Sequence, residues 1–151
     1  MSLLTIVLYI HILAAIVAVG FNISYAVWIV RARSSPTHMA FALSGVKFLD
    51  DRIANPAYGV LLLTGLLLVY LAHWSITTLW IDVALILFVA LIVIAAFFYS
   101  PALREQVKLA EAGDTSSPEF MRLAKKGQVL GPVIGVIVLV ILAMMVFKPT
   151  L

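Results

Sequence analysis

The feature that most constrains this chain is an uncharged apolar run near its N-terminus. From Leu3 to Val30 there is no Lys, Arg, Asp or Glu. At 1.5 Å per residue, a helix of this length exceeds the ~30 Å hydrocarbon layer of a bilayer. The run has no basic start and no clear cleavage site, and it is longer than the apolar part of a signal peptide. We therefore interpret it as the first membrane span.

Three further apolar runs follow, and 64% of the 151 residues are hydrophobic. Soluble domains contain about 45–50% apolar residues, so the chain is expected to be an integral membrane protein. Because lipid cannot satisfy backbone polar groups, the spans should be helices. We predict an all-α, antiparallel four-helix bundle forming one domain over residues 1–151. The expected spans are 3–30, 56–73, 80–99 and 129–147.

Polar segments join spans one and two, and spans three and four. Residues 37–55 mix apolar and charged side chains, which suits either an amphipathic surface helix or a polar extension of span two. Residues 101–112 continue span three as a polar helix. Ser116 to Glu119 resembles a capping box at the start of the last helix.

Basic residues are concentrated on one side of the predicted membrane. Of the ten Lys and Arg, only Lys148 lies on the other side. The remaining nine are Arg31, Arg33, Lys47, Arg52, Arg104, Lys108, Arg122, Lys125 and Lys126. This positive-inside bias predicts a bacterial inner (cytoplasmic) membrane protein whose two termini are on the non-cytoplasmic side. The basic residues flank spans, so they indicate lipid contact and no nucleic-acid partner.

The first span contains one ionisable residue, His11. At 100° per residue, Ala15, Ala18, Asn22 and Tyr25 lie within about 40° of it on a helix. A stripe of small side chains with polar ones at its borders should face other helices and not lipid. These five residues are the candidate cofactor-binding face.

His11 has three interpretations from the residues alone. It could be a structural histidine hydrogen-bonded between helices, an axial ligand of haem b, or a contact for a quinone or a proton relay. His73 beside Trp74 suits the membrane interface, and it is the candidate second ligand if a metal or haem iron is bound. Asp82 suits the start of a helix. A three-ligand metal site of His11, His73 and Asp82 is weakly indicated, because no two share a helix.

Two other features concern surfaces. The Asp50-Asp51-Arg52 cluster is typical of solvated charge near lipid headgroups. Gly127, Gly131 and Gly135, spaced by four, form a smooth strip that suits close packing of helices within the chain or in a homodimer.

Several short stretches resemble a known group of membrane proteins. They are Ile10-His11-Ile12, Asn55-Pro56-Ala57, Thr64-Gly65-Leu66, Trp80-Ile81 and Val146-Phe147-Lys148-Pro149. Together they resemble the HemJ-type protoporphyrinogen IX oxidases and their relatives, the CopD-like membrane domains and the integral membrane family named domain of unknown function 2269. In HemJ proteins the span-one histidine is thought to bind haem, so the resemblance implies that His11 is a haem ligand.

The resemblance departs from HemJ at the start of span three. Where that pattern reads Trp-Leu-His-x-Lys, this chain reads Trp80-Ile81-Asp82-Val83-Ala84. The resemblance therefore does not extend to protoporphyrinogen oxidase activity, and the uncharacterised family is the closer match.

We expect a haem b-binding membrane protein that exchanges electrons with a quinol or a porphyrin-like reductant. The alternatives are a non-redox assembly, transport or signalling partner with a structural His11, and a periplasmic-side metal-handling protein. Lipid and a second copy of the chain are the other expected partners.

Overall fold

The computed structural model describes residues 2–149, and 87% of these residues are helical. No strand occurs among the described residues. The elements are α1 (Leu3–Ala32), α2 (Pro36–Leu49), η1 (Asp50–Ala54), α3 (Asn55–Leu71), α4 (Leu79–Ile94), η2 (Ala95–Tyr99), α5 (Ser100–Glu111) and α6 (Pro118–Phe147). They form four continuous helical rods, each long and apolar enough to cross a membrane. The predicted all-α four-helix architecture is confirmed.

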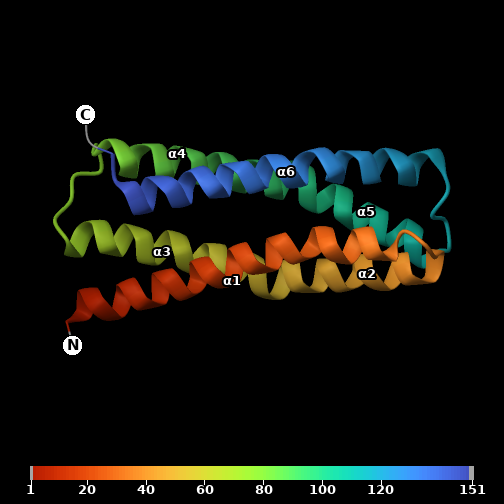
Figure 1. The fold of residues 1–151 in the computed structure, drawn as a ribbon, viewed down its shortest axis with the longest axis horizontal. Coiled ribbons are helices and arrows are strands. Elements are labelled where there is room, and N and C mark those ends of the chain that lie inside the picture. The colour runs from red at the N-terminus through yellow and green to blue at the C-terminus, as the bar shows by residue number, and fades with distance from the viewer. Residues whose placement is uncertain (1, 150–151) are drawn as a thin grey trace.

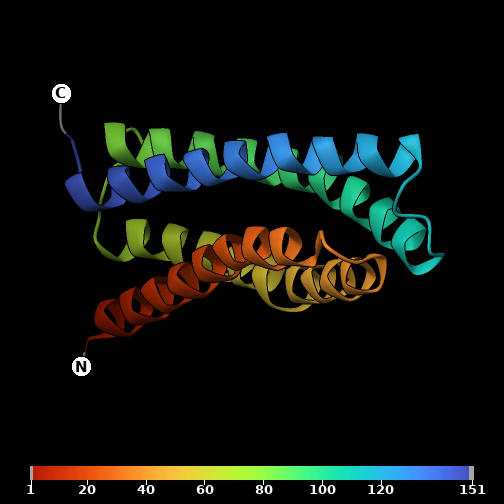
Figure 2. The same ribbon diagram turned by 45° about the vertical axis from the view of Figure 1, so that its right-hand side comes forward.

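The rods form two antiparallel hairpins (Figure 1). In the first, α1 lies along α2 and α3; in the second, α6 lies along α4 and α5. The hairpins meet through α2 and α5, and to a smaller extent through α1 and α6. Figure 2 shows the N-terminal part of α1 diverging from the second hairpin.

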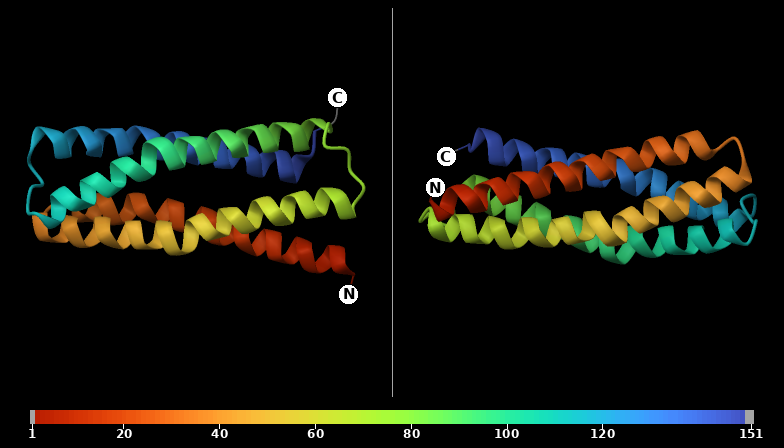
Figure 3. Two further views of the ribbon diagram at one scale, coloured as in Figure 1. Left: turned by 180° about the vertical axis from the view of Figure 1, so that it is seen from behind. Right: turned by 90° about the horizontal axis from the view of Figure 1, so that it is seen from below.

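The two ends of the bundle differ in chemistry. The α1–α2 and α5–α6 turns lie at one end, here called the polar end (Figure 3). The α3–α4 turn and both chain termini lie at the other, here called the apolar end (Figure 3). Nine of the ten basic residues lie on the elements of the polar half or at its turns.

Most of the tightly packed core lies toward the polar end. Leu43, Val46, Leu103 and Phe120 are buried there, at the contact between α2, α5 and the start of α6. The short helix α5 alternates such buried residues with exposed charges, as an amphipathic helix does. The two hairpins are therefore joined mainly outside the most apolar part of the chain.

Two π-helical segments interrupt the second and third rods. η1 is followed by Asn55-Pro56, and η2 by Ser100-Pro101. Proline lacks an N–H, and its ring clashes with the carbonyl four residues earlier. The preceding turn widens instead, with the Asn55 N–H donating to the Asp50 carbonyl five residues back.

The structure decides two local predictions. Residues 37–55 extend the second rod, and they do not form a separate surface helix. The start of α6 differs from the predicted capping box, because the N-cap is Ser117, whose hydroxyl accepts from the Phe120 N–H. In a capping box, the side chain of the third helical residue accepts from the backbone N–H of the N-cap. Here Phe120 holds that third position, and Glu119, one position earlier, pairs with Arg122 instead.

Candidate ligand cleft

An apolar cleft lies between the two hairpins in the apolar half. Its volume is about 710 Å³, within the roughly 300–1,000 Å³ range of ligand pockets. All four rods contribute to its walls, which are almost wholly aliphatic and aromatic. Tyr58, Leu91 and Val138 line its deeper part, and Trp74, Trp80 and Lys148 its outer rim. The cleft exists because the two hairpins touch near the polar end and diverge toward the apolar end.

His11 lies on the α1 wall of this cleft, and it is oriented by α3. Its Nδ1 is 2.8 Å from the Thr64 Oγ1. The Thr64 hydroxyl has one hydrogen, which it donates to the Val60 carbonyl at 2.6 Å. Oγ1 must therefore accept from His11, which places the imidazole proton on Nδ1. The Nε2 lone pair is left available, and no hydrogen bond from a residue in 2–149 uses it.

Gly65 makes room for the imidazole. A Cβ on this residue would lie 3.2 Å from the His11 Cε1, tighter than an ordinary contact. The ring thus rests against the α3 backbone, with Thr64 beside it. Two neighbouring residues of α3 fix both the position and the tautomer of a histidine on α1.

Lys148 brings a positive charge to the rim. It is in the left-handed region, with φ of 45°, and its N–H caps α6 by donating to the Met144 carbonyl. Its Nζ lies 4.8 Å from the ring centroid of Trp74 and 5.3 Å from that of Trp80. These cation–π contacts hold an ammonium beside the opening of the cleft.

The predicted cofactor-binding face is divided by the structure. His11 and Ala15 line the cleft, whereas Ala18 is fully buried in helix packing. Asn22 lies deeper and donates to the Tyr58 hydroxyl at 2.9 Å, which joins α1 to α3. Tyr25 is buried in the polar half, and its hydroxyl has no hydrogen-bond partner within residues 2–149.

His73 and Asp82 lie away from the cleft. His73 is exposed on the turn after α3, with φ of 55°, and Asp82 is exposed in the first turn of α4. Neither belongs to the cleft wall. Within residues 2–149, no group of three or more His, Asp or Glu side chains is close enough to hold a metal ion. The weakly indicated three-ligand site is therefore not assembled.

Comparison with known protein families shows to which family the chain belongs. The sequence model of a family described as "Predicted integral membrane protein (DUF2269)" matches residues 5–149. The chain belongs to this family. None of the curated proteins and none of the solved structures matches it. The family part of the sequence resemblance is confirmed, while the relation to HemJ-type and CopD-like proteins stays a prediction.

Two residues of this DUF2269 protein had no site role in the sequence analysis. Thr64 and Gly65 were noticed only as part of a resembling stretch, yet they hold His11. The available signal was a hydroxyl beside a glycine within an apolar run, where a polar group needs a partner. The second missed feature is the buried position of Asp50, which is only 7% exposed.

Proposed function

We propose that the cleft binds a flat, largely apolar cofactor, haem b, whose iron would be held by the His11 Nε2. The observation that carries this proposal is the His11–Thr64 hydrogen bond. Metal-ligating histidines generally donate their other ring N–H to a fixed acceptor, which sets the tautomer and the ring plane. Thr64 supplies such an acceptor at 2.8 Å.

The residues of the cleft fit the group in three respects. The walls offer a large apolar surface, and Ala15 and Gly65 are small enough to leave room beside the imidazole. His11 is a strong neutral donor for haem iron. Lys148 lies at the rim, where its ammonium would pair with an acidic group of the bound cofactor. His73 is outside the cleft wall, so we propose one histidine ligand from this chain.

Each residue then has a distinct task. Thr64 holds the imidazole in the ligating tautomer, and the aliphatic walls exclude water and lipid headgroups from the bound group. Lys148 neutralises a carboxylate at the opening. Bound haem would supply one-electron redox chemistry. A quinol or a porphyrin-like reductant entering from the membrane is the proposed electron donor.

The experiment is an absorption spectrum of the protein purified from cells supplied with haem. We expect a Soret band in the parent, loss of this band in His11→Ala, and no change in His73→Ala, which removes an exposed histidine outside the cleft. Thr64→Val should weaken haem retention, because the ring loses its acceptor. Absence of a Soret band in the parent, or a band unchanged by His11→Ala, would refute the proposal.

The structural interpretation of His11 makes the opposite prediction. If the bond to Thr64 serves only to join α1 and α3, the purified protein is colourless, and His11→Ala lowers stability alone. This is the observation that would favour a non-redox assembly, transport or signalling partner. The metal-handling alternative has less support, because the described residues assemble no cluster of three metal ligands.

We also propose that the polar end faces the cytoplasm. Nine of the ten basic residues belong to the polar half of the bundle, which the positive-inside rule assigns to the cytoplasmic side of a bacterial inner membrane. The cleft and both termini would then lie toward the opposite surface.

A further inference from the structure

Asp50 is a buried carboxyl group without an ion-pair partner. It is 7% exposed, and its one hydrogen bond is a long one of 3.4 Å from the Asn55 Nδ2. The nearby ammonium of Lys47 pairs with Asp51 instead. Among residues 2–149, no salt bridge includes Asp50. A buried carboxylate needs a cation or several donors, and the described residues give Asp50 neither.

Three tyrosines from three different elements lie in the part of the core that holds this carboxyl: Tyr25 is buried with Val46 and Ala54, and Tyr58 and Tyr99 pack against the same cluster. Tyr25 of α1, Tyr58 of α3 and Tyr99 of η2 all lie within electrostatic range of it. Tyr25 is only 3% exposed, and its hydroxyl has no hydrogen-bond partner in the described part of the chain. The Tyr58 oxygen accepts from Asn22, so its own hydrogen is free to be donated. The cluster is therefore rich in hydroxyl donors and contains one buried acid.

The cluster is placed by backbone geometry that is itself unusual. Asp50 is the first residue of η1, and Tyr99 is the last residue of η2. Each π-helical segment widens its helix directly before an X-Pro step, which redirects the side chains of that turn. Such segments occur often at functional sites in helices.

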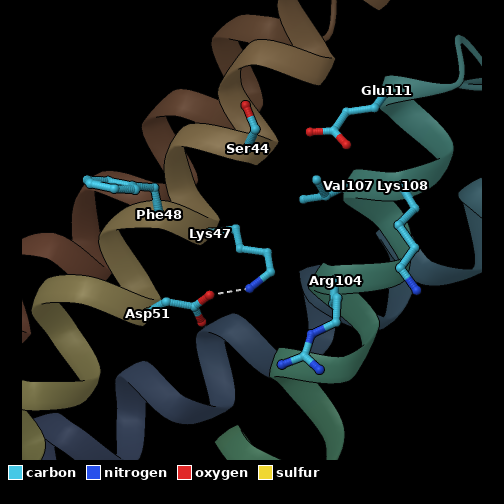
Figure 4. A pocket seen from close by; sticks show the side chains of 8 residues that line it. All are labelled: Ser44, Lys47, Phe48, Asp51, Arg104, Val107, Lys108 and Glu111. Atoms are coloured by element: carbon cyan, nitrogen blue, oxygen red, sulfur yellow. Dashed lines mark hydrogen bonds and ion pairs between the residues drawn. The ribbon is translucent and has the colours of Figure 1, made fainter.

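The cluster reaches one opening through Tyr58, and the sequence neighbour of Asp50 lines a second one. Tyr58 lines the deeper part of the cleft. Asp51 and Lys47 line a groove of about 380 Å³ between α2 and α5, the α2–α5 groove. Figure 4 shows Lys47 reaching toward Asp51 inside this groove, with Arg104 of α5 facing them. The residue next to Asp50 thus faces an open, charged surface of the polar half.

We propose that Asp50 is a buried proton-binding site that exchanges its proton with water in the α2–α5 groove. A hydronium ion in the groove gives its proton to the Asp50 carboxylate, which leaves water and a neutral carboxylic acid. The reverse step releases the proton. No electrons move, and no other reactant is required.

Tyr58 connects the proton-binding site to the cleft. It is a member of the cluster that also lines the cleft wall. A phenol can accept a proton at its oxygen while it donates its own hydrogen, so it can pass a proton without being ionised. A ligand whose oxidation or reduction in the cleft takes up or releases protons would then be connected to the polar end. The proton-binding proposal itself does not depend on which ligand occupies the cleft.

Infrared spectroscopy of the full chain in nanodiscs tests the site directly. At about pH 6, exposed carboxyl groups with ordinary pKa values near 4 are ionised. We expect a C=O stretch of a protonated acid that disappears as the pH is raised and moves to lower frequency in D₂O. Asp50→Asn should abolish this band. The matched control is Asp51→Asn, which removes the exposed neighbour and should leave the band in place.

The surroundings of the group provide a second readout. Tyr25→Phe and Tyr99→Phe each remove one hydroxyl, and at least one of them should shift the frequency of the band. Both variants keep the aromatic ring, so the packing is retained. A parent without the band, a band that survives Asp50→Asn, or a band unmoved by both tyrosine variants would overturn the proposal.

The route to water is tested with single cysteines, because the chain has none of its own. Ser44→Cys lies in the α2–α5 groove, and Leu62→Cys lies in the cleft. A bulky maleimide on the groove cysteine should slow deuterium uptake at the Asp50 band, and the same reagent in the cleft should not. Slowing by the cleft label alone would show that the proton enters from the other side, contrary to the proposal.

Discussion

The His11 imidazole and the Thr64 hydroxyl, 53 positions apart in the chain, are joined by a 2.8 Å hydrogen bond between α1 and α3. Because Thr64 donates its single hydrogen to Val60, the direction of this bond is determined, and with it the tautomer of His11. A single threonine therefore decides which imidazole nitrogen faces any ligand of the cleft.

Thr64→Val should destabilise the protein by about 1 kcal/mol, since it removes the partner of a partly buried N–H. Thr64→Ser retains the hydroxyl and should stay close to the parent. Thermal unfolding in one detergent, followed by circular dichroism, measures both. Equal stability of the valine and serine variants would mean that the bond contributes nothing to folding.

Gly65→Ala and Gly59→Ala form a matched pair on α3. At Gly59 an added Cβ meets nothing within 4 Å, so alanine should stabilise the helix by up to about 1 kcal/mol through its helix propensity. At Gly65 the Cβ lies 3.2 Å from the His11 Cε1, so the ring must move and the gain should be lost. Unfolding temperatures of the two variants test this difference. An equal rise in both would show that the imidazole is not held against Gly65.

Membrane orientation can be tested with two engineered cysteines. Ser2→Cys lies at the apolar end, and Thr115→Cys lies in the α5–α6 turn at the polar end. In intact cells, an impermeant maleimide should label the first and spare the second until the cells are opened. Labelling of both from outside would contradict the four-span topology.

Self-association is predicted to use the glycines of α6. A Cβ added at Gly127, Gly131 or Gly135 meets nothing within 4 Å, so the strip does not serve packing inside the described chain. The strip is thus free to contact a second copy of the chain. Gly131→Leu should leave the unfolding temperature of the monomer nearly unchanged and reduce the mass of the detergent complex from dimer to monomer. A parent that is already monomeric would contradict the prediction.

Much of the fold was predictable because it depends on local hydropathy. An uncharged run such as Leu3–Val30 must be helical in lipid whatever it packs against, since its backbone has no other source of hydrogen bonds. The polar helix α5 was predictable for a different reason, because its charges and its buried positions alternate with helical period. Pro56 and Pro101 follow the two interruptions of the rods, but a proline alone does not show that the turn before it is a π-helical segment.

The site required the tertiary structure. Lipid is as apolar as most side chains of the spans, so hydropathy does not reveal which face of α1 meets α3 or how far the hairpins diverge. His11 was identifiable as a lone ionisable residue in a span, but its partner, tautomer and clearance are set by Thr64 and Gly65 on another helix. Asp50 was interpreted as part of a solvated charge cluster, and its Asp51 neighbour is indeed exposed. Asp50 is a buried acid only in the assembled bundle, where α1, α2 and α3 pack against the widened turn, because burial is a property of the tertiary structure and not of the local sequence.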